Sequence, residues 1–449
     1  MPAIPLSTSH HQRRDGLMTL RAINLYWDQK VGAMFARPAM WSYQVKGTGP
    51  NRGLFYESGL YNSDRFYMSG SQMFRESAII GTHGGDDKVR FAGGLDGDLD
   101  CLIYCVGGVV FRYAGGVRSA VAMPDDRAIT DVAWFGNRFL YFVADGRFYW
   151  SDIADPTSIS GLSFATAEAK PDGLARAIVV GDRLYLIGFK TIEVWYLTQS
   201  LTAPFQPSTA ATIDMGALSA DAVLESKGRI YLVSDTRQIW LLAGELTQLA
   251  DDSVLEAIST APLDVISLAV VFIDGVEFLM VTSQATTTYV FNGSDWYRWH
   301  RHGAVSMNIA ATLVRDGVTY AADMTTGDIF TMQPGQNADS DGFIERVASG
   351  YIAIAGGVTR CHAVALQSAR GVGSLTITDP QVEMRYSDDG GNNYSDWMPK
   401  PLGKLGEYLT RPKWSALGMM RPFGRVFEFR CTADAAFTPQ AFTVNDTRM

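Results

Sequence analysis

The chain has 449 residues, of which 47% are hydrophobic and 19% are charged, so it is a globular protein with a large core and not a disordered one. Its 44 glycines and 12% aromatic residues are more typical of strands and tight turns than of helices. The formal net charge of −9 argues against nucleic-acid binding by general charge attraction, but it is compatible with a surface that DNA slides past.

Residues 1–50 show no repeat, and we expect them to form an N-terminal arm. The opening MPAIPLSTSHHQRRDG lacks the apolar stretch of a signal peptide, and no apolar run reaches the length of a membrane span. The sequence therefore predicts a protein that is made in a cytoplasm, stays soluble and has no membrane span. We expect Asn24, Tyr26 and Trp27 to pack an extended arm against the main body, behind a flexible tail of about a dozen residues.

A three-strand pattern recurs from Arg52 onward and is clearest in the segment 131–152, DVAWFGNRFLYFVADGRFYWSD. Apolar and polar residues alternate in it, with turn signals at Gly136-Asn137 and Asp145-Gly146. Strict alternation marks a strand with one buried face, and Asp-Gly between two such runs is a strong hairpin signal. The segment predicts an antiparallel meander that needs neighbours to bury its apolar face.

About seven such units follow one another, each of roughly 30 to 45 residues, which is the spacing of propeller blades, and we expect each blade to be a meander of three or four strands. The segment 131–152 would be the third. Each unit carries one large aromatic residue, which we place in the last strand of its blade. These residues are Phe74, Phe111, Trp150, Trp195, Trp240, Tyr289 and Phe330. A stack of β-sandwiches is the competing architecture, but no Cys-Trp-Cys signature supports it.

The repeated strand pattern ends after Gln333, where a polar and Gly-rich linker, PGQNADSDG, follows. Residues 340–449 then carry six to eight shorter strands, the content of a β-sandwich. The predicted fold is all-β, with an arm over 1–50, a propeller of about six to seven blades over 51–334 and a C-terminal β-sandwich-like domain over 340–449.

The four cysteines do not form a metal-binding pattern. Cys101 and Cys105 share one face of a predicted strand, so we interpret these two as buried small side chains, and the count of four, which includes Cys361 and Cys431, suggests a reducing compartment. The segment GGLDGDLD offers carboxylates but lacks the spacing and closing Glu of an EF-hand. We expect no metal and no cofactor.

Residues 296–302, WYRWHRH, are the densest aromatic and basic cluster, and they could stack on a sugar or a base. The simpler interpretation is the last strand of a blade and its exit loop, with Trp296 and Trp299 partly buried. His10-His11 and the pair His300 and His302 lack a carboxylate at ligand spacing, so neither pair predicts a metal site.

Ser387, Asp389, Gly391 and Tyr394 fit the S-x-D-x-G-x-x-aromatic pattern of the Asp-box hairpin found in sialidases. The pattern suggests a glycoside hydrolase, but the Asp in such a box caps a tight turn, and a single copy outside the propeller favours that structural role. The sequence also lacks the common nucleophile, zinc, P-loop and Rossmann motifs. We therefore expect no catalytic residues.

Several segments together resemble the packaged-DNA stabilisation proteins, also called tail hub or tail accessory factor proteins, of short-tailed phages. The matching segments are INLYWDQK with ARPAMWSYQVKGTGPNRGLFY, DRFYMSGSQMFR, KPDGLARAIVVGDRLYLIGFKTIEVWYLTQS and MRYSDDGGNNYSDW with RPKWSALGMMRPFGRVFEFRCT. In the third of these, the turn 171–173 precedes a strand that contains Thr191, Ile192, Glu193 and Trp195, as in the family. The sequence departs from the family at 37–40, where RPAM replaces a Pro-Gly turn.

The resemblance implies a structural virion protein and not an enzyme. Such proteins form a homo-oligomer, expected to be a hexameric ring, below the portal and adaptor ring, and they extend the DNA channel. Tail needle, plug or fibre proteins close that channel, and the passing DNA makes only transient contact. The alternative functions are a phage-associated propeller glycosidase or a carbohydrate-binding adhesin. If the protein is a hub, we expect the C-terminal domain or the propeller loops to supply the lateral and portal-side contacts.

Overall fold

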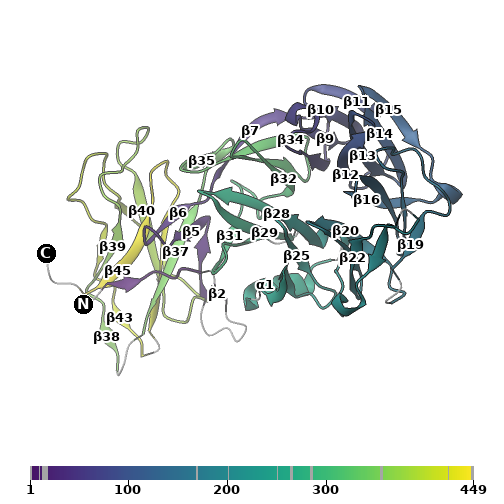
Figure 1. Ribbon diagram of the computed structural model, residues 1–449. Helices are drawn as coiled ribbons and strands as arrows, with labels where there is room; N and C mark the ends of the chain where they lie inside the picture. Colours follow the sequence, from purple (N-terminus) through teal and green to yellow (C-terminus); the bar gives the residue numbers. More distant parts are fainter. Residues whose placement is uncertain are drawn as a thin grey trace.

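The computed structural model describes residues 3–9, 11–12, 19–167, 170–200, 202–249, 251–262, 266–283, 287–353, 357–422 and 424–445. Nearly all regular structure in these ranges is β, and it divides into a ring of sheets and a separate two-layer domain (Figure 1). The all-β prediction, with a propeller followed by a sandwich, is confirmed.

Seven units of four strands follow one another in chain order, and the sixth of them is part of a larger sheet. The first four are β8 (Asn51–Phe55), β9 (Phe66–Ser69), β10 (Gln72–Arg75) and β11 (Ala78–Thr82); β12 (Arg90–Asp96), β13 (Leu99–Val106), β14 (Val109–Ala114) and β15 (Val117–Val121); β16 (Ile129–Phe135), β17 (Arg138–Val143), β18 (Arg147–Trp150) and β19 (Phe164–Thr166); and β20 (Leu174–Val180), β21 (Arg183–Gly188), β22 (Ile192–Leu197) and β23 (Phe205–Pro207).

The last three sheets are β24 (Val223–Ser226), β25 (Arg229–Val233), β26 (Ile239–Ala243) and β27 (Glu245–Gln248); β28 (Ile266–Ile273), β29 (Val276–Ser283), β30 (Thr287–Phe291) and β31 (Trp296–Trp299); and β32 (Ile309–Arg315), β33 (Val318–Asp323), β34 (Asp328–Gln333) and β7 (Ala39–Val45). The first strand of each sheet lies toward the centre of the ring.

Turn chemistry explains the meander over 131–152, which is the third sheet as predicted. Gly136 and Asn137 both have positive φ, 60° and 57°, the conformation of a two-residue hairpin turn that Gly and Asn adopt most easily. Strand β17 after this turn is buried along its whole length, because the neighbouring sheets cover both of its faces.

The large aromatic residues lie one strand closer to the centre of the ring than the last strand, where we predicted them. All seven are in the third strand and not the last, since each blade has four strands, the larger of the two numbers that we expected. These outer strands are short or polar, as in β19 and β23, so they carry little apolar periodicity.

The seventh sheet is completed by the N-terminal part of the chain. Strand β7 pairs antiparallel with β34, from Ala39 opposite Gln333 to Val45 opposite Asp328. Part of the range 1–50, which we expected to be an arm, therefore lies inside the propeller and closes the ring.

The C-terminal domain consists of two sheets that face each other. One contains β37 (Arg346–Ile352), β44 (Arg425–Cys431), β40 (Gln381–Ser387) and β41 (Met398–Pro401), and the other contains β1 (Ile4–Pro5), β45 (Pro439–Val444), β39 (Ala363–Ser368) and β42 (Lys413–Ser415). Phe427 and Phe429 of the first sheet meet Phe442 of the second, with ring centroids 5.4 and 5.8 Å apart.

The remaining elements are short. They are β2 (His11–Gln12), β3 (Thr19–Leu20), β4 (Ala22–Ile23), β5 (Leu25–Asp28), β6 (Ala33–Ala36), β35 (Ala338–Asp339), β36 (Gly342–Phe343), β38 (Thr359–Arg360), β43 (Met419–Met420), the helix α1 (Asp252–Thr260) and the 3₁₀ turns η1 (Leu60–Ser63), η2 (Pro124–Asp126), η3 (Thr209–Ala211) and η4 (Ala220–Ala222).

Candidate functional site: the joint between the propeller and the sandwich

A single short strand joins the two domains into one sheet. Strand β4 pairs in parallel with β31 of the sixth propeller sheet through Ile23 and Arg298, and antiparallel with β37 of the sandwich through Ala22 and Ala348. The result is a nine-stranded sheet, β28-β29-β30-β31-β4-β37-β44-β40-β41, that runs from one domain into the other. Backbone hydrogen bonds on both sides of β4 therefore couple the domains.

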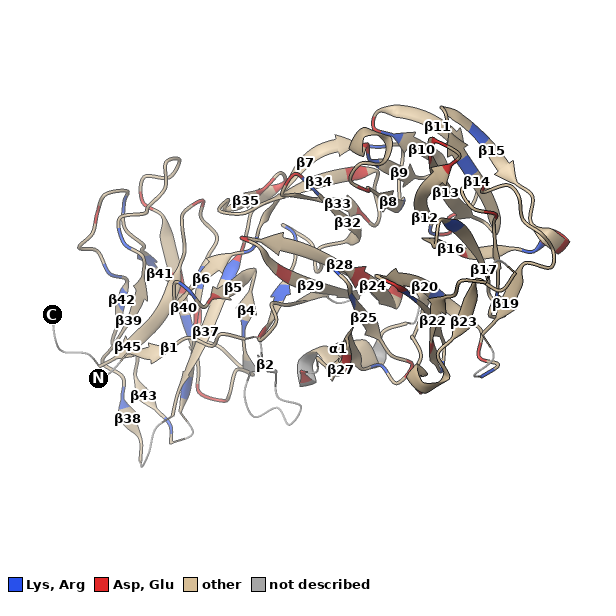
Figure 2. Cartoon of the chain, in the orientation of Figure 1, with Lys and Arg blue, Asp and Glu red and all other residues tan. Residues whose placement is uncertain are grey.

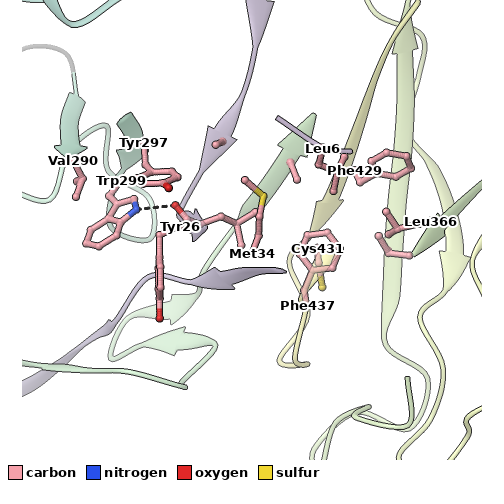
Figure 3. Packing of buried hydrophobic residues seen from close by; sticks show 14 of the residues in the cluster. Leu6, Tyr26, Met34, Val290, Tyr297, Trp299, Leu366, Phe429, Cys431 and Phe437 are labelled. Carbon is pink, nitrogen blue, oxygen red and sulfur yellow. Dashed lines mark hydrogen bonds between the residues drawn. The ribbon is translucent and has the colours of Figure 1, made fainter. Parts of the chain in front are cut away.

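The apolar core is also continuous across the joint (Figure 3). One buried cluster contains Val290 and Trp299 from the propeller, Met34 from the hairpin β5–β6, and Phe429 and Phe437 from the sandwich. The Trp299 indole Nε1 donates a hydrogen bond to the Leu25 carbonyl oxygen at 3.1 Å, drawn dashed in Figure 3. Shared burial of this kind opposes bending at the joint, because any opening would expose apolar surface to water.

A buried ion pair fixes the linker between the domains. The Arg37 guanidinium lies 2.6 Å from the Asp339 carboxylate, and both side chains are fully buried. Asp339 also accepts the backbone N–H groups of Met40 at 2.8 Å and His302 at 3.2 Å. Burial raises the pKa of the Asp339 carboxyl, but the hydrogen bonds and charge of Arg37 outweigh this, and that pKa is lowered.

Asn24 connects this ion pair to the joint. Its backbone has a φ of 54°, a left-handed conformation that Asn tolerates better than most residues. The Asn24 side-chain oxygen accepts hydrogen bonds from Arg37 Nε at 3.1 Å and from the His300 backbone N–H at 2.8 Å. Its side-chain nitrogen donates to the Glu345 carbonyl oxygen at 2.8 Å. One amide thus ties together the arm, the sixth sheet and the linker.

The aromatic cluster 296–302 belongs to this joint and not to an open binding surface. Trp296 and Trp299 are buried in β31, so neither ring is free to stack on a base or a sugar. His300 is half-buried, and burial lowers the pKa of its imidazole. His302 contacts the Phe343 carbonyl oxygen through Nδ1 at 3.0 Å. The interpretation as a last blade strand with its exit loop agrees with this arrangement.

The Asp-box residues form a closed turn after β40. Asp389 Oδ1 accepts the backbone N–H groups of Asn392 and Asn393 at 3.1 and 2.9 Å, and the Ser387 hydroxyl donates to it at 2.7 Å. Hydrogen bonds, first from Asn393 and then from Ser387, lower the pKa of this carboxyl to about 2. Gly391 donates its N–H to Ser387 Oγ. The Asp389 carboxylate therefore stabilises the turn through hydrogen bonds within it.

The cysteines and the acidic segment 93–100 also have structural roles. Cys101 and Cys105 are buried in β13, Cys361 and Cys431 are buried in the sandwich, and all four are free thiols. Burial raises the pKa of the Cys105 thiol to about 12. Asp96 pairs with Arg112. Among the described residues, which exclude His10, no three His, Cys, Asp or Glu side chains gather as a metal site would require.

The propeller centre contains an ion pair that no local sequence motif indicates. Arg90 of the second sheet lies 2.7 Å from Asp221 of the fifth, and Lys88 lies 3.1 Å from the same carboxylate. Because these two sheets stand on opposite sides of the ring, the ion pair crosses the axis of the propeller. Burial raises the pKa of Asp221, but Arg90 and Lys88 outweigh this and lower it. The carboxylate therefore stays ionised and is unsuited to donate a proton.

Two family models match this chain in the order of its domains. The model described as the β-propeller of bacteriophage P22 Gp10 matches residues 26–307, and the model described as the β-sandwich of the same protein matches residues 348–446. This chain belongs to the P22 Gp10 family. Family membership makes it a structural tail protein of a bacteriophage and therefore a virion component. The Gp10 propeller match begins in β5 and ends before β32, so it includes the closing strand β7 but not the rest of the seventh sheet.

No curated protein matches the chain. Solved structures that resemble it include BBS1N in complex with ARL6DN, at 12% identity and a TM-score of 0.46 over 67% of this chain and 98% of that one. Another is the β-propeller domain of Myceliophteria thermophila Cps50 (Swd1), at 11% identity and a TM-score of 0.42 over 65% of this chain and 98% of that one. A third is the extracellular domain of the putative one component system BT4673 from B. thetaiotaomicron, at 9% identity and a TM-score of 0.45 over 83% of this chain and 49% of that one. No helix among the described residues is long and apolar enough to cross a membrane.

Proposed function

We propose that this protein is a tail hub, or nozzle, subunit. Copies of the chain assemble as a ring, expected to be hexameric, below the portal and its adaptor ring, where they extend the DNA channel and help retain the packaged genome. The observation that carries the proposal is the match of both Gp10 domains, in order, to this one chain. The protein would be made in the host cytoplasm, and tail needle, plug or fibre proteins would bind on the far side of the ring.

The narrow centre of the propeller limits where the proposed DNA channel could run. The cavity there measures about 240 Å³, less than the 300 Å³ or so that a small-molecule pocket usually needs, and the ion pair from Arg90 to Asp221 crosses it. A duplex cannot pass through such a centre. The channel would therefore lie between copies of the chain, and the excess of acidic residues over the whole chain would limit adhesion of the DNA backbone.

The same centre does not favour the glycosidase alternative. Cleavage of a glycosidic bond ordinarily uses two carboxyl groups that flank the bond. Asp221 is the one carboxylate that lines the cavity within the described residues, and it is ion-paired to two cations. We therefore propose that the protein has no catalytic residues and acts by assembly.

Two neighbouring loops of the sandwich provide a surface for such assembly. Gly406 donates its N–H to the Gly371 carbonyl oxygen at 3.0 Å, so the loops 369–376 and 402–411 lie side by side. Together they expose five large apolar side chains, which are Val372, Leu375, Leu405, Tyr408 and Leu409. Leu375 is 92% exposed and Leu409 is 94% exposed. Apolar side chains held together and open to water mark a contact with another protein.

Light scattering tests the proposal on the full-length chain, alone and with portal–adaptor complexes. We expect a ring to form, either spontaneously or on the complex, with contacts that bury about 1,000 Å² or more each. A chain that stays monomeric under every condition would reject the hub assignment.

A double variant, Leu375→Asp with Leu409→Asp, should abolish assembly while the melting temperature stays unchanged, because both side chains are exposed. Val117→Asp is the matched control, since Val117 is also an exposed apolar residue, but it lies on the outer strand β15 of the propeller. Normal assembly of the double variant would show that other surfaces make the contacts.

A further inference from the structure

A pocket of about 400 Å³ lies between the tip of the hairpin β5–β6 and two turns of the sixth propeller sheet. We call it the hairpin pocket. It is lined by residues 26–30 of the hairpin, by the turn between β28 and β29, and by residues 292–294 between β30 and β31. Its volume is within the range of about 300 to 1,000 Å³ that is usual for ligand pockets.

Hydrogen bonds hold the rim of the hairpin pocket in place. Asp28 Oδ1 accepts the backbone N–H groups of Lys30 at 2.7 Å and Val31 at 3.2 Å, which fixes the turn at the hairpin tip. Gln29 Nε2 donates to Ser294 Oγ at 3.3 Å and so ties the tip to the sixth sheet. A pocket that is already formed loses less conformational entropy when its ligand binds.

Aromatic rings form one wall of the pocket. Tyr26, Trp27 and Phe278 line it, and the rings of Tyr26 and Phe278 meet edge to face with centroids 5.2 Å apart. The faces of such rings attract cations, and the guanidinium group of arginine more often than the ammonium group of lysine. Because an aromatic wall also suits an apolar group or a sugar ring, the polar groups beside it decide which ligand fits.

Negative charge exceeds positive charge at this pocket. Asp28 and Asp274 line it together with one cation, the exposed Lys30, and within the described part of the chain none of these three forms an ion pair. Asp295 adds a third carboxylate next to the lining, where it accepts a hydrogen bond from the Ser294 hydroxyl at 2.8 Å. Figure 2 shows acidic and basic positions interspersed over both domains, so these local charges set the preference of the pocket.

The Tyr26 hydroxyl is a second, independent indication of a ligand. Tyr26 is only 8% exposed, yet its hydroxyl forms no hydrogen bond with any described residue. In Figure 3 this hydroxyl points away from the other labelled side chains of the apolar core. Burial raises the pKa of the hydroxyl to about 12, and the negative charges of Asp274 and Asp28 add to that effect. Buried polar groups nearly always have a partner, so a hydrogen-bonding ligand is expected beside Tyr26.

We propose that the hairpin pocket binds the guanidinium group of an arginine side chain that belongs to another protein chain of the virion. The planar cation would lie against the aromatic wall and donate N–H groups to the Asp274 and Asp28 carboxylates and to the Tyr26 hydroxyl oxygen. A protein partner fits a structural tail protein, and the inference needs neither a ring nor a particular number of copies.

Isothermal titration of the full-length chain with N-acetyl-arginine amide tests this site. N-acetyl-citrulline amide is the control ligand, because its urea group has nearly the shape of a guanidinium but no charge. We expect the arginine compound to bind about tenfold more tightly. Equal affinities, or no binding of the arginine compound, would overturn the proposal. The titration does not depend on assembly, so its failure is distinguishable from failure of the hub assignment, which light scattering measures.

Two variants place the binding in the pocket. Tyr26→Phe and Asp274→Asn should each weaken arginine binding about fivefold, since one removes a hydrogen bond and the other a charge. Tyr26→Phe should leave the melting temperature unchanged, because the hydroxyl has no partner to lose. Asparagine tolerates the φ of 50° at position 274, so that turn is kept.

Asp182→Asn is the matched control, because Asp182 lies in the corresponding turn of the fourth sheet and is 96% exposed. It should bind the arginine compound as the natural chain does. If Asp182→Asn weakens binding as much as Asp274→Asn, or if both pocket variants bind like the natural chain, the cation is not held in the hairpin pocket.

Discussion

Arg37 and Asp339 are fully buried charges at the joint between the two domains, and each depends on the other. A buried ion pair adds little stability compared with a well-packed apolar replacement. Removing one partner, however, leaves the other charge buried without a counter-charge. Arg37 also donates a hydrogen bond to the Asn24 side-chain oxygen, and Asp339 accepts one from the Met40 backbone N–H in β7, so the pair fixes the position of several chain segments at once. We therefore expect the joint to be more sensitive to these two residues than to any exposed ion pair.

Replacement of Arg37 by Met should destabilise the protein by about 3 to 5 kcal/mol, because Asp339 is left buried and unpaired. Chemical denaturation of the full-length chain measures this. The double variant Arg37→Met with Asp339→Asn should lose less than the sum of the two single variants, since neither charge is then left alone. Arg183→Met is the control, because Arg183 is largely exposed and its nearest carboxylate, Asp182, is almost fully so. A loss of less than about 1 kcal/mol in Arg37→Met would contradict the assignment.

The stabilisation from Asp339 should also depend on pH in a defined direction. Its folded-state pKa is lowered from the ordinary 3.8, so its contribution is complete above 3.8 and is lost as the pH falls through the lower folded value. The melting temperatures of the natural chain and of Asp339→Asn should therefore differ by a constant amount near neutral pH and converge in acid below 3.8. A difference that disappears between pH 7 and pH 5 would point to another group.

At the scale of the elements, strand β7 decides whether the ring closes. Met40 and Ser42 donate their N–H groups outward, to Asp339 Oδ1 and Ser340 Oγ. Because N–H directions alternate along a strand, the Trp41 N–H points at β34. The strand is therefore held on one side by the seventh sheet and on the other by the linker, which makes the N-terminal segment part of both domains.

Replacement of Trp41 by Pro should cost about 2 to 3 kcal/mol, because proline removes a hydrogen bond of the sheet and cannot adapt its backbone. Trp41→Thr is the matched control, since threonine suits a strand and the Trp41 side chain is 44% exposed. Denaturant titration compares the two variants. If Pro and Thr have the same effect, β7 is not required to close the propeller.

Local chemistry made most of the elements predictable. The Gly136-Asn137 turn and the alternation of β17 follow from short-range preferences, and they identified the third blade. Strands β4 and β7 were not predictable, because their partners lie hundreds of residues away and the strands themselves carry no repeat. The sequence left three or four strands for each blade, because several outer strands are too short or too polar to show a period. The ion pair from Arg90 to Asp221 joins residues 131 positions apart, so only the closed ring brings it together.

At the scale of the whole molecule, the two domains are joined by three kinds of contact. The nine-stranded sheet, the continuous apolar core and the Arg37–Asp339 pair all cross the joint. Deletion of residues 340–449 would leave β4 without β37 and expose this core, so point variants on the surface are the better probes of assembly.

The most direct test is the position of the propeller in the assembled tail, measured by electron cryomicroscopy of portal–adaptor complexes that carry the full-length chain. The propeller centre is closed, so the proposal predicts several copies arranged around an open axis, with the DNA path between them. A single copy on the axis, with its propeller centre in line with the portal channel, would contradict it.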